Sequence, residues 1–293
     1  MEAMPIALTV DDAPSVFAPG SPDFDPGRMD RVREALQETG VRHCVAFVIG
    51  ERARDHREPL RRWLEAGYEL GNHTEAHFAA SRVGADAYLE GVRGCHALLN
   101  ELGAFDGGRR AYFRHPFGDR GAAGGAREAI DRAIAQLGYT HADVTLNLHD
   151  YCYEAPFIAA AHTADAARQT RIRARYRRVA DACVARAGKR GAAHWGAQFM
   201  HVAACHFGPL SEHELGGLVR DLGSRVAFRP LAEAIETPAY RRLAADLSHN
   251  GIAGDLLHRR LRDRALRKLA RSTRRLGLFQ QSRLGPCWPH LAP

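Results

Sequence analysis

Short apolar runs alternate with longer amphipathic stretches along this 293-residue chain, and this alternation limits the possible folds more than any other feature. The apolar runs predict strands over residues 6–10, 44–49, 68–71, 111–113, 140–144, 197–200 and 226–228. The amphipathic stretches predict helices over residues 28–39, 57–66, 86–102, 127–137, 164–187 and 212–222. Such alternation is typical of a parallel sheet with helical crossovers. About seven or eight strands in one α/β domain favour a (β/α) barrel.

The chain divides into two parts by composition. Residues 1–245 carry the alternating pattern and are predicted to form the barrel, whereas residues 246–293 are a basic C-terminal extension. Within the extension, leucines recur at helical spacing among arginines over residues 256–276, which predicts an amphipathic basic helix. We expect this helix to pack on the barrel with its arginines in solvent; docking to an acidic partner or an anionic surface is the alternative.

Bulk composition restricts the class of protein. Hydrophobic residues make up 45% and charged residues 26% of the chain, which is ordinary for a soluble globular protein. No run approaches the roughly 20 apolar residues of a membrane span, and the first residues do not resemble a signal peptide. A cytoplasmic location is therefore expected. The six cysteines include no C-x-x-C pair, so buried thiols are expected rather than disulfides.

The net charge of +7 raises the question of nucleic acid. Only two of the 41 basic residues are lysine, a bias that genome composition can explain as well as phosphate binding can. Aromatic residues are not interleaved with the basic clusters, as a base-stacking surface requires. Nucleic acid is therefore not the expected partner.

Polar side chains that can perform chemistry follow several predicted strands, at the point where each strand ends. They are Asp11 and Asp12, His73 and His77, Arg114, and His201. The carboxyl ends of parallel strands converge on one face, where barrel enzymes build their active sites. We therefore expect these side chains to meet. Taken alone, a histidine such as His201 on an apolar strand is more often a hydrogen-bonded core residue.

A two-histidine, one-carboxylate metal site is the simplest use of these groups. His73 and His77 share one side if a helical turn begins between them, and Thr74 could cap that turn. Asp11 or Asp12 would add the carboxylate. On an extended strand successive side chains point apart, so one aspartate can bind a metal while the other faces water. This set suits zinc hydrolases and non-haem iron oxygenases alike, and spacing does not separate them.

The ordered motifs resemble those of the polysaccharide deacetylase family, the NodB-homology or carbohydrate esterase family 4 enzymes. The family motifs are T-F-D-D-G, H-[ST]-x-x-H, R-x-P-[YF]-G, an Asp/Trp stretch and L-x-H. This chain reads T-V-D-D-A from Thr9, H-T-E-A-H from His73, R-H-P-F-G from Arg114, D-Y from Asp150, and F-M-H from Phe199. The resemblance runs from about residue 6 to residue 235. It implies a distorted (β/α) barrel.

The resemblance also implies roles for individual residues. Asp12, His73 and His77 would hold a divalent metal, most simply Zn²⁺, with Co²⁺ or Ni²⁺ as alternatives. Asp11 would be the general base, held in its ionised form by Arg114. His201 would be the general acid, kept protonated by Asp150. Residues implied to contact the substrate are Pro116 and Phe117 at the oxyanion, and Tyr151 and Phe199 at the acyl group.

The function that these roles imply is metal-dependent hydrolysis of an N-acyl amide, N-acetyl above all, on an amino sugar, an oligosaccharide or a small N-acylated metabolite. The segment 150–194 could cap the pocket, which would favour a small substrate. Two alternatives stay open: a metal-independent amidohydrolase like the allantoinase relatives of the family, and a non-catalytic module that binds carbohydrate or a protein partner. The sequence makes no prediction about oligomeric state.

Overall fold

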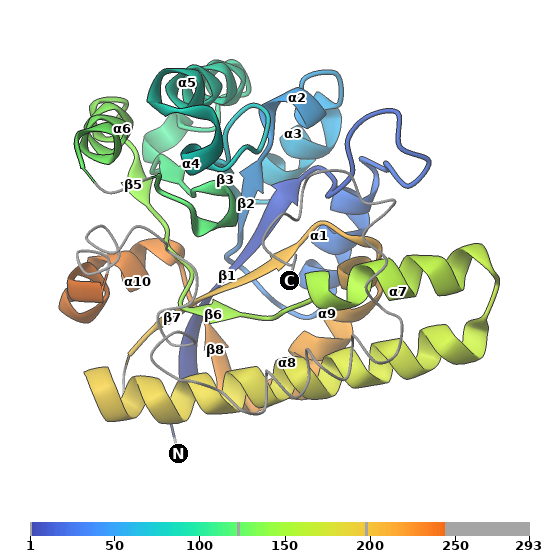
Figure 1. Ribbon diagram of the computed structural model, residues 1–293. Coiled ribbons are helices and arrows are strands. Elements are labelled where there is room, and N and C mark those ends of the chain that lie inside the picture. The colour runs from blue at the N-terminus through green and yellow to red at the C-terminus, as the bar shows by residue number, and fades with distance from the viewer. Residues whose placement is uncertain (1, 122–123, 197–198, 244–293) are drawn as a thin grey trace.

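A computed structural model describes residues 2–121, 124–196 and 199–243 of the chain. These residues form one parallel eight-stranded sheet that curls into a distorted (β/α) barrel, as predicted (Figure 1). The strand order is β5-β4-β3-β2-β1-β7-β6, and β8 pairs with β1. The strands are β1 Met4–Ala13, β2 Val45–Val48, β3 Glu69–Asn72, β4 Tyr112–Phe113, β5 Thr140–His141, β6 Leu146–Asn147, β7 His201–His206 and β8 Val226–Phe228. The predicted basic extension, 246–293, lies outside the described residues.

Strand β1 is the centre of the sheet, and it is buried from Ile6 to Ala13. Its first half pairs with β8 and its second half with β2. Strand β7 also pairs with β1: His201 lies opposite Ile6 at one end, and His206 lies opposite Asp11 at the other. The two ends of β7 therefore lie at opposite ends of the barrel. Among the described residues no ladder joins β5 to β6, so the barrel is open between them.

Helices cover the outside of the sheet (Figure 1). They are α1 Arg28–Glu38, α2 Gly50–Ala53, α3 Arg57–Glu65, α4 Ala80–Val83, α5 Ala85–Glu101, α6 Gly125–Gln136, α7 Tyr151–His162, α8 Ala166–Trp195, α9 Pro209–Leu222 and α10 Leu231–Glu236. Short 3₁₀ turns occupy Asp106–Gly108, Pro116–Gly118 and Gly223–Arg225. The predicted helices are confirmed, with shifts of up to three residues at most ends, but α8 ends eight residues later than predicted, at Trp195. Helix α7 and the short helices α2, α4 and α10 were not predicted.

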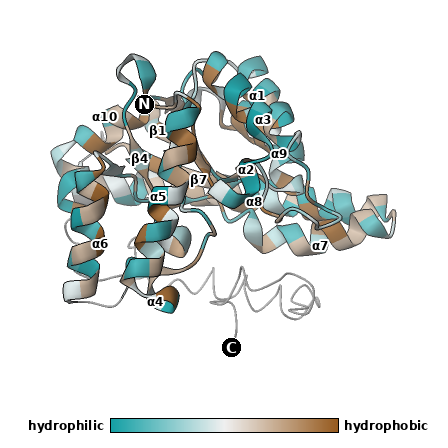
Figure 2. Ribbon diagram, turned by 90° about the horizontal axis from the view of Figure 1, so that it is seen from above, coloured by the Kyte–Doolittle hydropathy of each residue, from teal (hydrophilic) through white to brown (hydrophobic). Residues whose placement is uncertain are grey.

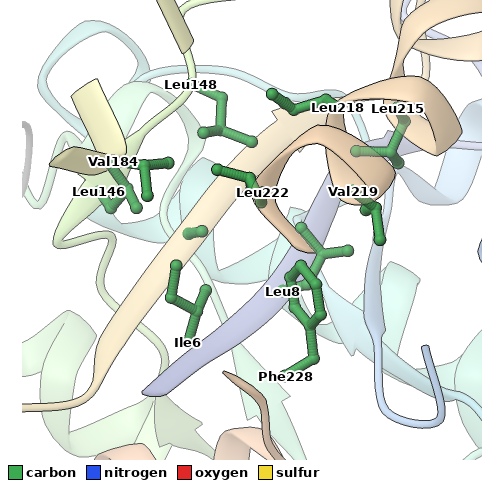
Figure 3. A pocket seen from close by; sticks show the side chains of 11 residues that line it. Ile6, Leu8, Leu146, Leu148, Val184, Leu215, Leu218, Val219, Leu222 and Phe228 are labelled. Atoms are coloured by element: carbon green, nitrogen blue, oxygen red, sulfur yellow. The ribbon is translucent and has the colours of Figure 1, made fainter. Parts of the chain in front are cut away.

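The main core lies between the sheet and the helices α1, α3, α5, α7, α8 and α9. Figure 2 shows hydrophobic colour on β1 and β7 inside a ring of helices whose surfaces carry hydrophilic segments. Trp63 is fully buried, with its ring 4.9 Å from that of Tyr68 and 5.5 Å from that of Phe207. A small gap in this core is lined only by apolar side chains, among them Ile6 and Leu8 (Figure 3). The sheet is thus held from its helical side by close apolar packing.

The seventh strand was predicted in the wrong place. The strand was predicted over residues 197–200, whereas β7 begins at His201. Helix α8 continues to Trp195, and Phe199 stacks on Trp195 with ring centroids 4.8 Å apart. Phe199 therefore packs at the end of α8, and the chain joins the sheet later than predicted.

The segment 150–194, predicted as a possible cap, forms α7 and most of α8. Both helices contribute to the main core, through Tyr153 and Phe157 on α7 and Tyr176 and Val184 on α8. They pack against each other and against α9. Most of this segment is therefore part of the barrel's outer layer. Its length gives no support to the preference for a small substrate.

None of the described helices combines the length and apolar character needed to cross a membrane.

Candidate active site

The adjacent carboxylates at the end of β1 are separated by an irregularity in the strand. Asp12 has a φ of 65°, and the pairing register with β2 shifts between Val10 and Ala13. A shift of this kind is a β-bulge, which redirects side chains locally. Asp11 and Asp12 are both buried, with 5% and 3% of their surface exposed. The predicted division of labour between them therefore depends on a bulge as well as on strand alternation.

The predicted metal ligands meet in the fold. Oδ1 of Asp12 lies 3.1 Å from Nε2 of His77 and 3.6 Å from Nε2 of His73. All three side chains are buried, and Oδ1 of Asp12 makes no hydrogen bond within the described residues. Two neutral imidazoles and a carboxylate are the donor set of many zinc sites. The arrangement therefore fits a divalent cation, as predicted.

The tautomer of His73 suits this role. Its Nδ1 lies 2.7 Å from the carbonyl oxygen of Arg114, which can only accept, so Nδ1 carries the proton and donates. The lone pair is then on Nε2, the atom that faces Asp12. Burial, followed by the neighbouring His77, lowers the pKa of His73 to about 4 and keeps its ring neutral. Fixing the tautomer through the second ring nitrogen is the usual way in which proteins orient a metal ligand.

The H-T-E-A-H segment is a loop and not the helical turn that was predicted. Thr74 and His77 have φ values of 66° and 54°, in the left-handed region. The hydroxyl of Thr74 accepts a hydrogen bond from the backbone N–H of His77 at 3.1 Å, and Asn72 Oδ1 accepts one from the N–H of Thr74 at 2.8 Å. Thr74 therefore does tie the segment down, but by closing a tight turn.

Arg114 fixes Asp11, as predicted. Its Nη1 donates to Oδ1 of Asp11 at 2.5 Å and to the hydroxyl of Thr9 at 2.6 Å. Its Nε donates to the carbonyl of Ala142 at 2.7 Å, and the guanidinium lies 4.1 Å over the ring of Phe47. The carboxylate of Asp11 is thus held in one position by a buried cation.

The partner of Asp150 is His206, and the predicted contact with His201 is wrong. Oδ1 of Asp150 lies 2.9 Å from Nδ1 of His206, and Oδ2 accepts from the backbone N–H of His206 at 2.6 Å and from the hydroxyl of Ser211 at 2.7 Å. Burial disfavours the imidazolium, but Asp150 outweighs it and raises the pKa of His206 to about 10. His206 is therefore a protonated imidazole beside Asp11 on the neighbouring strand.

His201 is a core histidine at the other end of β7. Its Nε2 donates to the carbonyl of Ala187 at 3.1 Å, and its Nδ1 lies 3.2 Å from the hydroxyl of Thr145. The ring is fully buried, and burial lowers its pKa to about 4. A neutral, enclosed imidazole with both nitrogens engaged cannot serve as the acid.

The signal that would have found His206 was in the sequence. The apolar run from Val202 to Cys205 ends at this histidine, and the strand-end argument applies to it directly. The motif L-x-H was matched to F-M-H at Phe199, although A-C-H at Ala204 is the sequence that ends the strand. Strand β7 is hard to predict from the sequence, because its alanines are only weakly hydrophobic.

Of the predicted substrate-contacting residues, some lie at the site and one lies away from it. Phe199 packs on His201, with ring centroids 4.8 Å apart, and belongs to a separate apolar cluster with Leu243, so its predicted place at the acyl group is wrong. Tyr151 stays near the site, 5.6 Å from the ring of His206. Phe117 follows the buried Pro116, and its ring lies 4.6 Å from that of His77.

Comparison with known proteins bears on these motifs directly. Residues 1–142, which include β1, the H-T-E-A-H loop and the R-H-P-F segment, match the family model described as polysaccharide deacetylase. This part of the chain, just under half of it, therefore matches the polysaccharide deacetylase family. A peptidoglycan-N-acetylglucosamine deacetylase of Bacillus cereus is 27% identical over 114 residues, which cover 39% of this chain and 36% of that protein. The match thus spans about a third of the length of that relative.

Solved structures of other proteins share the barrel fold of this chain. The peptidoglycan deacetylase PdaC of Bacillus subtilis has a TM-score of 0.51 at 18% identity, and the match covers 85% of this chain and 97% of that one. A Bacillus anthracis protein described as a pseudoenzyme of carbohydrate esterase family 4, in a variant with restored activity, has a TM-score of 0.54 at 14% identity, covering 80% and 68%. The fold therefore occurs in active and inactive proteins alike, and function has to be argued from the site.

We expect His77→Ala to bind one equivalent of Zn²⁺ fewer than the unaltered protein, because it removes one of three buried donors. Asp11→Asn is the matched control: it changes a neighbouring carboxylate that is not among the ligands and should keep the full metal content. Equilibrium dialysis with metal analysis measures both. Unchanged metal content in His77→Ala would remove it from the ligand set.

Asp150→Asn should lower the pKa of His206 by at least about one unit, since a neutral amide no longer stabilises the imidazolium. The folded-state pKa of His206 is raised from 6.5 to about 10, so the pair stabilises the fold fully below pH 6.5 and loses this contribution as the pH rises through about 10. The stability difference between the two proteins should therefore shrink at high pH. Histidine NMR titration and urea unfolding across pH test this; an unmoved His206 resonance contradicts it.

Proposed function

We propose that this protein is a metal-dependent N-deacetylase that removes the acetyl group from an amino sugar. One observation carries the proposal. A buried trio suited to a divalent cation, Asp12, His73 and His77, lies at the same end of the barrel as the carboxylate of Asp11, paired with Arg114, and a protonated imidazole, His206. Amide hydrolysis needs a base for the attacking water and an acid for the leaving amine. We assign the first role to Asp11 and the second to His206.

The trio would hold the cation, which when bound polarises the acyl carbonyl and makes water more acidic. Asp11 accepts the proton of the attacking water, and Arg114 holds its carboxylate in position. His206 donates a proton to the departing nitrogen, since an amine leaves poorly unless it is protonated. Asp150 holds His206 charged and oriented through Nδ1, leaving Nε2 as the donor. The backbone N–H of Phe117 is assigned to the carbonyl oxygen, in the role of an oxyanion donor.

Zinc is the metal that we propose, because imidazole and carboxylate donors suit it and the site is buried. Cobalt or nickel could replace it. The alternative of a metal-independent amidohydrolase is disfavoured because both histidines of the trio are present and oriented. A non-catalytic module is disfavoured by Asp11 and His206, which a purely binding protein would not need. The pseudoenzyme among the structural neighbours makes the direct test necessary.

The substrate class that we favour is an N-acetylated amino sugar unit within a saccharide. The relatives named as deacetylases of peptidoglycan N-acetylglucosamine and N-acetylmuramic acid support a carbohydrate over another N-acylated metabolite. The segment 150–194, predicted as a possible cap, forms packed helices of the barrel's outer layer, so it gives no reason to restrict the substrate to a monomer. Acetate is the expected acyl product.

His206→Asn should lower kcat by about 10²–10⁴-fold, the usual contribution of a positioned general acid. His201→Asn is the matched control on the same strand. It disturbs a buried histidine with two partners and should cost stability of about 1–3 kcal/mol, while the folded fraction keeps most of its activity. Activity per folded molecule, with folding checked by circular dichroism, separates the two. Loss of kcat in His201→Asn together with near-normal kcat in His206→Asn would reverse the assignment.

Acetate release should be seen with N-acetylated amino-sugar oligomers, should disappear on chelation and should return with Zn²⁺ or Co²⁺. The panel should pair each N-acetylglucosamine oligomer with its monomer and with N-acetylated amino acids as non-sugar controls. Turnover of the amino acids alone would contradict the substrate class. Activity that survives complete metal removal would contradict the mechanism.

A further inference from the structure

A second cluster of potential metal ligands lies outside the site described above. It consists of His115 after β4, His141 at the end of β5 and Asp131 on α6. Oδ1 of Asp131 is 3.6 Å from Nε2 of His141 and 4.0 Å from Nε2 of His115. We propose that these three residues form a second, structural binding site for a divalent transition metal, with Zn²⁺ as the best-suited ion. The proposal does not depend on the function argued above.

The donor spacing supports this. In a tetrahedral zinc site with donors about 2.0–2.2 Å from the ion, neighbouring donor atoms are about 3.4 Å apart. The two measured distances exceed that value by well under 1 Å, a gap that side-chain rotation closes. In the trio of the candidate active site the same distances are 3.1 and 3.6 Å. Both clusters therefore offer two imidazoles and one carboxylate at nearly the same spacing.

Unpartnered buried atoms give independent support. His115 is 2% exposed, and its Nε2 makes no hydrogen bond within the described residues. Oδ1 of Asp131 and Nδ1 of His141 are also buried there without a hydrogen bond. Leaving three buried polar atoms without partners in one place lowers the stability of the fold. A bound cation would satisfy the first two directly.

The ring of His115 is oriented as a metal ligand would be. Its Nδ1 lies 2.7 Å from the hydroxyl of Tyr88, which leaves Nε2 facing the cluster. In the active-site trio, the carbonyl of Arg114 does the same for His73. Burial and the neighbouring His141 lower the pKa of His115, and burial and Arg120 lower that of His141, so both imidazoles are in the neutral form that a metal requires.

One neighbouring cation opposes the proposal. Nη1 of Arg120 lies 3.8 Å from Oδ1 of Asp131. Its Nη2, however, donates to the buried carboxylate of Asp143 at 2.6 Å, so a second anion already balances the guanidinium. The side chains of His141 and Asp131 are 21% and 28% exposed, which gives an ion and its waters a path to the cluster. The site is closed on the His115 side and open on the other.

The location gives the site a consequence. His115 lies between Arg114, which holds Asp11, and Pro116 and Phe117 of the following turn. An ion that joins His115 to β5 and α6 would tie this turn to the outer layer of the barrel. We therefore expect a structural role, seen as stability, rather than participation in catalysis.

The test is metal stoichiometry in protein that carries no polyhistidine tag. Apo-protein prepared with a chelator is dialysed against Zn²⁺, and the bound metal is measured. We expect two equivalents in the unaltered protein, and one equivalent each in Asp131→Ala, in His141→Ala and in His77→Ala. The double variant His77→Ala/His141→Ala should bind none. Glu128→Ala, an exposed change on the same helix as Asp131, is the matched control and should bind two.

Two partly exposed positions are used because changing the buried His115 could prevent folding; circular dichroism verifies each variant. One equivalent in the unaltered protein would overturn the proposal. So would two equivalents in both Asp131→Ala and His141→Ala, because the second ion would then lie elsewhere. Loss of metal in His77→Ala alone reports on the active-site trio, so failure of the second site and failure of the proposed function give different results.

Discussion

The buried ion pair between Arg114 and Asp11 is the interaction on which the rest of the site depends. Arg114 joins β1 through Asp11 and Thr9, joins the loop after β5 through Ala142, and packs over Phe47 of β2. Its carbonyl accepts from His73, so the same residue fixes the carboxylate of Asp11 and the tautomer of a candidate metal ligand. Removing one partner of such a pair leaves an uncompensated buried charge, which typically costs about 3–5 kcal/mol. The arrangement therefore holds Asp11 and the candidate ligand set in one rigid unit.

Backbone strain is concentrated around this unit. Six described residues other than glycine have φ values in the left-handed region, and four of them, Asp12, Thr74, His77 and Phe117, lie here. Each such residue costs on the order of 1 kcal/mol, so a protein keeps several of them together only where surrounding contacts hold them in place. Asp12 lies at the bulge of β1, Thr74 and His77 lie in the H-T-E-A-H loop, and Phe117 lies in the turn after Arg114. The left-handed backbone at these residues points their side chains in directions that a regular strand or helix would not give.

The contact between Asp150 and His206 gives one histidine of the site a different charge from the others. His206 is held charged and His73 neutral, although both are buried histidines within the same barrel. The difference is one carboxylate in direct contact. His201 is also neutral, because it is buried without an acidic partner. Its hydrogen bonds join β7 to α8 and to the chain before β6. Burial alone therefore does not assign a role to a histidine; the neighbouring charge does.

Much of this could be predicted from local sequence. The alternation of apolar and amphipathic segments determines the barrel, and the ends of β1, β3 and β4 determine that Asp11, Asp12, His73 and Arg114 converge. These predictions succeed because strand periodicity and the common face of parallel strands are properties of the chain itself. The choice of acid failed because β7 is built from small residues, so its register was read four residues too early.

Only the tertiary structure decided which histidine faces Asp150, that Phe199 lies away from the site, and that His115, His141 and Asp131 form a second cluster. Each of these depends on contacts between segments far apart in the chain, and sequence spacing does not encode such contacts. The sequence determined the chemical groups and the face of the barrel on which they gather. Packing of α8 against Phe199 and the pairing of β7 with β1 determined which of those groups meet.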